Sequence, residues 1–342
     1  MGFEGFPLVI GWELTLSCNI RCRHCASSAG LPRSQELTLN EALTICDQFP
    51  ELLVQEVDFT GGEPLLRPDW TRIVSFLTLK GIPTKILTNG LVLGPRTVAE
   101  MKDAGVAGVG ISIDGLETTH DYVRGHAKLF RSVITGIERL LQNDIPVTVI
   151  TTVNALNVGE LSGILALLRG IGVKQWRVQP FAPSGRGRDS KELLLSQEDY
   201  QRIEVFFAQW TAELAASDFH LASADSCGYF SEFEPADQPW LGCTAGLTAC
   251  GIMSDGKVKG CLSLPDNLVE GDLRTMDLWD IWFNPNSFAY TRKFAQADMG
   301  PLCCHCPKWE QCRGGCSAMS YTSTGLFHND PYCFYRTKVI TE

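Results

Sequence analysis

The sequence contains no apolar stretch approaching the ~18 residues that a membrane-spanning helix requires, and its mean hydropathy is near zero. Its first residues lack the basic start, apolar segment and cleavage site of a secretory signal, so we expect no export. Positive charge is also sparse, because the formal net charge is −10 and no basic run exceeds "RCR" or "GRGR". These absences argue against a membrane-spanning protein and against binding to nucleic acid or anionic membranes through phosphate contacts.

Cysteine is missing from a long central segment and abundant on either side of it. None of the 14 cysteines lies between Cys46 and Cys227, whereas ten fall from Cys227 to Cys333. In a chain without an export signal, this abundance indicates metal or redox chemistry rather than disulfides. Cys46 falls on the apolar face of a predicted helix, where we expect a core position.

The central segment alternates between β-rich runs and amphipathic helical runs. We predict strands over 8–16, 54–60, 82–88, 106–114, 145–153 and 173–181. We predict helices over 39–49, 68–81, 95–104, 130–142, 157–169 and 196–215. This alternation indicates parallel βαβ units, and six of them would form an open barrel or a doubly wound sheet.

This regularity stops near residue 216, where the composition changes. Residues 216–242 have no clear periodicity, and we expect them to form a connector. From residue 243 the chain is rich in glycine and cysteine and has little apolar periodicity with which to build its own core. We therefore predict an α/β domain over 1–215, the connector, and a metal-stabilised domain over 243–342.

Three cysteines follow the first predicted strand, in the segment "LTLSCNIRCRHCASSAG" (14–30). Cys18, Cys22 and Cys25 are separated by three and then two residues. A closed zinc site needs a fourth ligand, and a short loop cannot easily direct both neighbouring cysteines and His24 at one ion. Three thiolates on a [4Fe–4S] cluster leave one iron open, so the motif favours a catalytic cluster.

The spacing CxxxCxxC after a first strand resembles the signature of the radical S-adenosylmethionine (SAM) superfamily. The resemblance implies a partial (β/α)6 barrel in which SAM binds the open iron through its amino and carboxylate groups. An electron from the cluster then cleaves SAM to methionine and a 5′-deoxyadenosyl radical, which abstracts hydrogen from an unactivated C–H bond. The cofactor supplies this chemistry, and the protein directs it.

Residues at the ends of later strands extend the resemblance. In "TGGEP", Gly61 and Gly62 permit close approach of the backbone, and Glu63 supplies an anion. The family places such a Gly-Gly-Glu at the amino group of SAM. Asn89, in "TNG", is a further candidate contact, although an ordinary turn residue is an equal alternative.

Three more residues match family positions that contact SAM. Ser112 ends the fourth predicted strand, where relatives use a serine on the ribose. Arg124 follows twelve residues later, and the equivalent arginine pairs with the methionine carboxylate. Gln179 ends the sixth strand, near the place where relatives contact adenine. Asp114 is as readily a turn residue as a functional one.

The C-terminal cysteines resemble a second pattern, the SPASM domain of radical SAM enzymes that modify peptides and proteins. Its seven motif cysteines are matched by Cys243, Cys261, Cys303, Cys306, Cys312, Cys316 and Cys333. The resemblance implies two auxiliary [4Fe–4S] clusters, and therefore three clusters in all.

By analogy, Cys243, Cys261 and Cys316 hold the inner auxiliary cluster. Either Cys250 completes its ligand set or one of its irons stays open. The outer auxiliary cluster would be held by Cys303, Cys306, Cys312 and Cys333. Cys304 is out of register with the motif, and a zinc ribbon is the structural alternative for the whole domain.

The SPASM resemblance favours a polypeptide substrate. Sulfatase maturases carry an aspartate base directly after the cysteine equivalent to Cys261, whereas this sequence has Leu262, so that reaction loses favour unless Asp266 substitutes. Many peptide maturases begin with a leader-recognition domain, which we do not find here, so a separate protein or the SPASM domain would take that role. We expect flavodoxin or ferredoxin as the electron donor, in the reducing cytoplasm that oxygen-sensitive clusters require.

Three hypotheses follow. The first is a maturase that crosslinks a ribosomal peptide by a C–C or thioether bond, with the auxiliary clusters accepting an electron. In a variant of it, Cys227 acts as the hydrogen donor of a peptide epimerase, although a spare buried thiol is the alternative. The second is the same scaffold acting on a small molecule such as a sugar, an amino acid or a tetrapyrrole precursor. The third is a non-enzymatic zinc scaffold.

Overall fold

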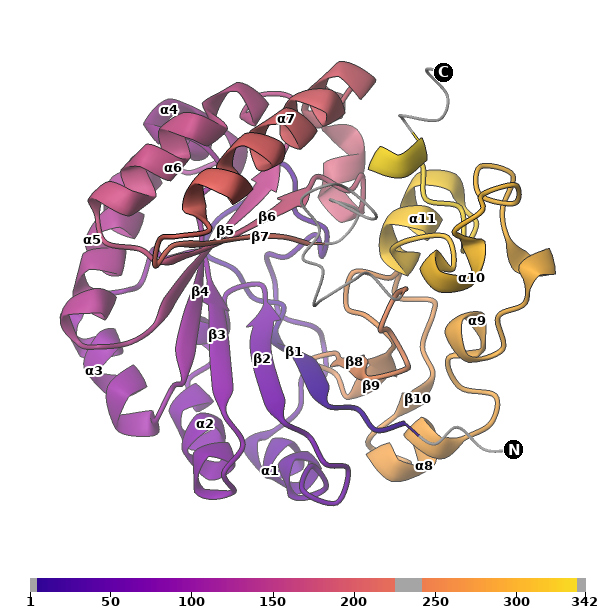
Figure 1. Cartoon of the computed structure of the whole chain (residues 1–342). Coiled ribbons are helices and arrows are strands. Elements are labelled where there is room, and N and C mark those ends of the chain that lie inside the picture. The colour runs from indigo at the N-terminus through magenta and orange to yellow at the C-terminus, as the bar shows by residue number, and fades with distance from the viewer. Residues whose placement is uncertain (1–4, 225–241, 337–342) are drawn as a thin grey trace.

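Parallel strands alternate with helices along the N-terminal part of the chain (Figure 1). The computed structural model describes residues 5–224 and 242–336, so Cys227 lies outside the described residues. The strands are β1 (Val9–Thr15), β2 (Glu56–Gly61), β3 (Thr84–Thr88), β4 (Gly108–Ser112), β5 (Val147–Val153), β6 (Gln175–Pro180) and β7 (His220–Ser223). The helices are α1 (Leu39–Asp47), α2 (Trp70–Leu79), α3 (Pro95–Ala104), α4 (Glu117–Arg124), α5 (Leu129–Gln142), α6 (Leu161–Gly170) and α7 (Gln197–Leu214).

The order of the strands decides between the two predicted architectures. From β1 to β7 each strand pairs in parallel with the next one along the chain. A doubly wound sheet would reverse its strand order at a switch point, and this sheet does not. The helices cover its outer face (Figure 1), so the predicted open (β/α) barrel is confirmed.

The wall of the barrel follows from the alternation of side chains along each strand. In β5, buried and half-buried residues alternate from Val147 to Val153, and the buried set includes Val147 and Val149. Ile150 and Thr152, of the half-buried set, line a cavity inside the barrel. Successive residues of a strand point to opposite faces, so the valines pack against the helices. Helix α5 buries a matching stripe of Leu129, Val133, Gly136, Ile137 and Leu140.

The apolar core lies between the outer face of the sheet and the helices. Trp12 of β1 is fully buried, and its ring centroid lies 5.9 Å from those of both Phe49 and Phe59. Cys46 of α1 is also fully buried, which confirms its predicted core position. Helix α1 starts at a capping box, in which Thr38 and Glu41 satisfy each other's backbone N–H groups.

The C-terminal domain continues the same sheet. Its elements are β8 (Ala249–Ile252), β9 (Lys257–Lys259), β10 (Gly271–Asp272), α8 (Leu278–Phe283), α9 (Ala289–Arg292), α10 (Trp309–Cys312) and α11 (Ser317–Thr324). Strand β8 pairs in parallel with β1, from Val9 opposite Ala249 to Trp12 opposite Ile252. The domain therefore lies beside β1 (Figure 1), and a shared sheet fixes the two cysteine-rich regions relative to each other.

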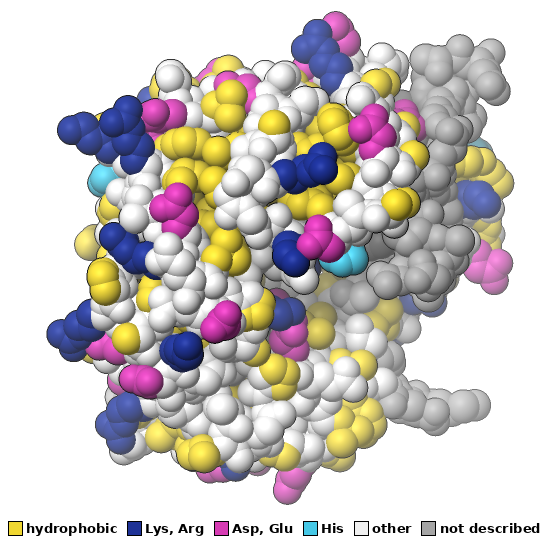
Figure 2. Space-filling view, turned by 60° about the vertical axis from the view of Figure 1, so that its left-hand side comes forward, with side chains coloured by type: hydrophobic (Ala, Val, Ile, Leu, Met, Phe, Trp, Pro, Cys, Tyr) yellow, Lys and Arg dark blue, Asp and Glu magenta, His cyan; other side chains and the backbone are white. Residues whose placement is uncertain are grey.

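The surface carries charges of both signs. Figure 2 shows basic and acidic side chains interspersed over the helix-covered face. Across residues 5–224 and 242–336, no helix combines the length and the apolar content needed to cross a membrane.

Two elements of the barrel part of the chain were not predicted. Strand β7 lies inside the segment expected to be a connector, and its residues are too few and too exposed to give a periodic signal. Helix α4 was also missed, because its three buried residues include His120 and Arg124, so the helix has little apolar periodicity. The left-handed Gly125 that ends α4 was the available signal.

Candidate active site

A cavity of about 310 Å³ lies between the carboxyl ends of the barrel strands and the C-terminal domain. The predicted site residues that line it are Cys18, Cys22, Cys25, Gly61, Gly62, Asn89, Ser112, Arg124, Gln179, Cys261 and Cys316. Residues from separate strands gather here because the carboxyl ends of parallel strands meet at one rim of a barrel. Thiols from the two ends of the sequence therefore share one cavity.

The cysteine loop, residues 18–30, is braced by the segment that follows β6. Arg186 donates from Nε to the Cys22 carbonyl oxygen at 2.8 Å and from Nη2 to the Ala29 carbonyl oxygen at 3.2 Å. A Cβ at Gly185, whose φ is +53°, would overlap a carbonyl of the loop. This close packing holds the three thiols at the rim although the loop has no regular secondary structure.

The thiols of the loop are free and suit a cationic ligand. Burial raises the pKa of Cys22 to about 11, while the charge of Arg124 lowers it. Burial also raises the pKa of Cys18. Thiolates are the metal-binding form, so bound iron would supply the positive charge that burial otherwise denies them. The donor set therefore fits the cluster that the sequence predicts.

The Gly-Gly turn after β2 packs directly against the cysteine loop. Gly62 N donates to the Thr15 carbonyl oxygen and Glu63 N donates to that of Ser17, both at 2.8 Å. A Cβ at Gly62 would overlap the Ser17 carbonyl, so only glycine permits this approach.

The carboxylate of Glu63 is fully buried and is directed at β3 rather than into the cavity. It accepts hydrogen bonds from Thr88 Oγ1 at 2.9 Å, from Asn89 N at 2.8 Å and from Leu65 N at 3.2 Å. Burial raises the pKa of Glu63 to about 7, although these donors oppose the rise. Glu63 thereby orients Asn89, whose Nδ2 donates to Cys18 Sγ at 3.9 Å.

Arg124 and Asp114 form a buried ion pair at the cavity. Arg124 Nε lies 2.6 Å from Asp114 Oδ2, and Arg124 Nη1 donates to Cys22 Sγ at 3.8 Å. His24 Nε2 lies 3.3 Å from the same carboxylate oxygen. Although burial opposes ionisation, the charges of Arg124 and His24 hold the pKa of Asp114 below its usual range. Asp114 therefore anchors two side chains of the cavity wall, a role that its sequence position did not reveal.

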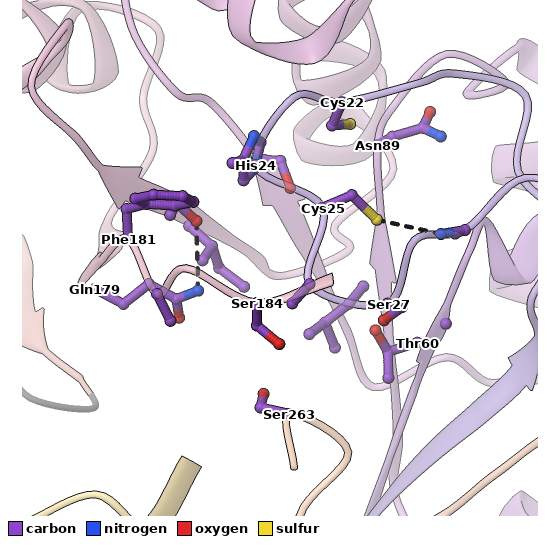
Figure 3. A pocket seen from close by; sticks show the side chains of 18 of the residues that line it. Cys22, His24, Cys25, Ser27, Thr60, Asn89, Gln179, Phe181, Ser184 and Ser263 are labelled. Carbon is purple, nitrogen blue, oxygen red and sulfur yellow. Dashed lines mark hydrogen bonds between the residues drawn. The ribbon is translucent and has the colours of Figure 1, made fainter. Parts of the chain in front are cut away.

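Hydroxyl and amide groups form the rest of the wall. Gln179 donates from Nε2 to Thr152 Oγ1 at 3.4 Å. Figure 3 shows Ser184, after β6, and Ser263, from the C-terminal domain, with their hydroxyl groups pointing toward one another in the cavity. Sequence reasoning missed both serines. The signal for Ser263 was its place two residues after Cys261, next to the position at which sulfatase maturases carry an aspartate base.

Asp266 does not take the place of the missing aspartate base. Its carboxylate binds Lys259 Nζ and Arg33 Nη1, each at 2.9 Å, and it is not among the residues that line the cavity. Leu262, at the position of that base, packs against Gly251 of β8. The geometry therefore leaves the sulfatase-maturase reaction without its base.

The four predicted ligands of the outer cluster surround a second cavity, of about 350 Å³. Its lining includes Cys303, Cys306, Cys312 and Cys333. Burial, and then the charges of Asp330 and Cys333, raise the pKa of Cys303 to about 12. Within the two described ranges, no three His, Cys, Asp or Glu side chains converge as ligands of a single metal ion. Thiols set around a cavity suit a multi-iron cluster better than one zinc ion.

The predicted ligands of the inner cluster lie at the first cavity and around strand β8. Cys261 and Cys316 line the first cavity, and Cys243 precedes β8. Cys250, on β8 opposite Ile10, is buried, which raises its pKa to about 12. Cys304 lines neither cavity, consistent with its place outside the motif.

A parallel barrel with three thiols on the loop after its first strand, opening onto a second thiol-rich domain, defines an iron–sulfur radical enzyme. Residues 12–168 match the model of the radical SAM superfamily, and residues 243–307 match that of the SPASM iron–sulfur cluster-binding domain. The chain belongs to the radical SAM superfamily and carries a SPASM domain, as its motifs predicted. Its cofactors are SAM and iron–sulfur clusters, and the zinc-scaffold hypothesis is not supported.

Named relatives include enzymes with different substrates. The chain is 32% identical to the AdoMet-dependent heme synthase of Methanosarcina barkeri, over 96% of this chain and 97% of that protein. It is 31% identical to the mycofactocin maturase MftC of Mycobacterium ulcerans, over 96% of this chain and 88% of that protein. SuiB of Streptococcus suis, solved with its precursor peptide SuiA, has a TM-score of 0.77 at 18% identity, over 97% of this chain and 77% of SuiB. At that identity the likeness to SuiB shows the fold alone.

Proposed function

We propose that this enzyme oxidises its substrate in the 310 Å³ cavity, using one SAM-binding and two auxiliary [4Fe–4S] clusters. The observation that carries the proposal is that Cys261 and Cys316 line the same cavity as Cys18, Cys22 and Cys25. Ligands of an electron acceptor thus lie across the cavity from ligands of the radical-generating centre. A substrate held between them can lose a hydrogen atom on one side and an electron on the other.

The chain's own residues have distinct tasks in this proposal. When bound, the first cluster and SAM supply the 5′-deoxyadenosyl radical, and the three thiolates of the cysteine loop hold that cluster. Gly62 holds the turn after β2 against the cysteine loop, and Arg124 orients the methionine carboxylate of SAM from a side chain already fixed by Asp114. Ser112 and Gln179 lie where the ribose and adenine would rest.

We propose a ribosomally made peptide as the substrate, crosslinked by a C–C or thioether bond. The SPASM domain, the likeness to MftC and the peptide bound by SuiB support this choice. Loss of two hydrogens in such a crosslink requires an electron acceptor, which the inner auxiliary cluster provides. The outer cluster would pass electrons onward, with flavodoxin or ferredoxin as the reductant of the first cluster and a separate protein for leader recognition. Cytoplasmic location follows from the oxygen sensitivity of these clusters.

The test is the intact mass of a candidate peptide. The enzyme is coexpressed with a short reading frame that lies next to its gene, and Cys18→Ala is compared with the matched control Cys304→Ala. We expect a loss of two hydrogens that disappears in Cys18→Ala and persists in Cys304→Ala. An unchanged mass that gains one unit in deuterated water would instead indicate epimerisation and assign the hydrogen donation to Cys227.

A second candidate substrate is a tetrapyrrole, and Arg177 favours it. Of the three arginines that line the cavity, Arg124 is held by Asp114 and Arg186 by backbone carbonyls. The side chain of Arg177 forms no hydrogen bond or close ion pair with any described residue, although its charge is among those that oppose the burial-driven rise in the pKa of Asp58. A guanidinium in a cavity that is not held by a hydrogen bond suits the carboxylates of a porphyrin side chain, and the likeness to heme synthase points the same way.

This candidate is tested by anaerobic incubation with iron coproporphyrin III, SAM and dithionite. A change in porphyrin mass that Arg177→Gln reduces at least tenfold, with abortive SAM cleavage retained, would favour the tetrapyrrole over the peptide. An unmodified porphyrin beside a modified peptide would eliminate it.

A further inference from the structure

The hydroxyl of Tyr290, in α9, is buried and has no hydrogen-bond partner in the described part of the chain. Burial raises the pKa of Tyr290 well above its usual range. Buried hydroxyl groups in folded proteins nearly always have a partner, because water can no longer supply one. An unpartnered donor at this depth therefore points to a group that the polypeptide does not itself provide.

The backbone around Tyr290 fixes its hydroxyl beside the inner-cluster ligands. A Cβ added to Gly260, the residue before Cys261, would overlap the Tyr290 hydroxyl and would lie 3.4 Å from Ala245 Cβ. Thr291 Oγ1 donates to the Ala245 carbonyl oxygen at 2.7 Å. Two segments that carry predicted ligands thus converge on this one hydroxyl.

The ring is held firmly in this position. It stacks on Phe327 with centroids 4.5 Å apart and an interplanar angle of 8°. His328 Nε2 lies 2.6 Å from the Tyr290 carbonyl oxygen.

We infer that Tyr290 donates a hydrogen bond to the inner auxiliary cluster held by Cys243, Cys261 and Cys316, and thereby raises its reduction potential. A donor to a cluster sulfur stabilises the reduced state, which carries the greater negative charge. The cluster becomes a better acceptor of the electron that leaves the oxidised substrate. The inference rests on the proposed function only for the presence of this cluster and is independent of the substrate.

The experiment is an EPR-monitored redox titration of anaerobically reconstituted protein carrying Tyr290→Phe. The Cys18→Ala, Cys22→Ala and Cys25→Ala changes are added to remove the signal of the first cluster. Phenylalanine keeps the ring stacked on Phe327, so the fold is preserved and only the donor is lost. Tyr321→Phe is the matched control, because its ring packs on the same Phe327, with centroids 4.8 Å apart, and lies outside the assigned contact.

We expect Tyr290→Phe to shift one of two midpoint potentials to a more negative value, with iron content unchanged and no shift in Tyr321→Phe. Unchanged potentials would overturn the inference. Loss of iron from Tyr290→Phe would overturn it too, because the hydroxyl would then be a ligand. A parent protein that binds zinc in this domain would contradict the proposed function itself, a result distinct from either of these.

Discussion

The guanidinium of Arg124 lies 2.6 Å from the carboxylate of Asp114, and both side chains are buried at the rim of the barrel. The same carboxylate oxygen lies 3.3 Å from His24, inside the cysteine loop. One aspartate thus sets the positions of a cluster-loop side chain and of the arginine that approaches Cys22. Its removal should affect both the stability of the fold and the binding of SAM.

Asp114→Asn should destabilise the protein by about 3 kcal/mol, because it leaves the Arg124 charge buried and uncompensated. The free energy of unfolding is measured with urea on anaerobically purified protein, and the affinity for SAM is expected to fall with it. Glu117→Gln is the control, since the Glu117–Arg131 pair is largely exposed and its loss should leave the unfolding midpoint nearly unchanged. Equal effects of the two substitutions would contradict the anchoring role of Asp114.

Glu63 should make stability fall as pH rises between about 5 and 7. Burial raises its pKa from 4.5 to about 7, so in this window the folded protein keeps a proton that the unfolded chain has released. The contribution of Glu63 to the free energy of unfolding is complete below the pKa that it has in the unfolded chain. This contribution, about 3 kcal/mol, is lost as pH rises through the pKa that Glu63 has in the folded protein. Urea unfolding at pH 5, 6, 7 and 8 checks this.

Glu63→Gln is the comparison for that titration, because the amide has no proton to lose in this range. The free energy of unfolding of the parent protein, relative to that of Glu63→Gln, should fall from pH 5 to about pH 7 and then level off. Parallel stability curves would mean that Glu63 is ionised throughout and would contradict its raised pKa.

Cysteine spacing located thiols that the fold brings to two cavities, because the three predicted ligands of the first cluster lie on a single loop. The partners of buried charges could not be predicted in this way. Arg124 donates to Cys22 across 102 residues of sequence, and that contact exists only once the barrel has closed. Contacts that form only in the closed barrel also distinguish Asp114 from an ordinary turn residue. They direct the carboxylate of Glu63 toward β3, although the sequence suggested a contact with SAM.

The strand and helix pattern of the barrel was readable wherever an apolar face repeats. It failed for α4, which buries His120 and Arg124 rather than an apolar stripe. The choice of an open barrel over a doubly wound sheet depended on strand order, which periodicity does not encode. Ser184 and Ser263 became candidates only when two domains were seen to share a cavity (Figure 3).

Arg33 should couple the two domains, because it binds buried Glu13 of β1 at 2.6 Å and Asp266, after Cys261, at 2.9 Å. Arg33→Gln leaves Glu13 without its counter-charge and should cost about 3 kcal/mol. It should also raise the fraction of SAM that is cleaved without substrate oxidation, since the two cluster-bearing segments lose their link. Product and 5′-deoxyadenosine are quantified in one assay.

The control is Lys174→Gln, which breaks an exposed pair with Asp218 and should change neither the stability nor the fraction of SAM cleaved without product. If that fraction were unchanged in Arg33→Gln, Arg33 would not couple the two domains.

Gly62→Ala should abolish SAM cleavage, because the added Cβ would overlap the Ser17 carbonyl and displace the cysteine loop. Overpacking of this kind costs about 1–3 kcal/mol, and here the strain falls on the segment that holds Cys18. Iron content should drop to that of Cys18→Ala, while the auxiliary clusters keep their absorbance. Gly170→Ala, at the end of α6 with no atom within 4 Å of the new Cβ, is the control and should retain iron and activity. If Gly62→Ala kept full iron and cleaved SAM at the normal rate, the close approach of this turn to the cysteine loop would not be what holds the site together.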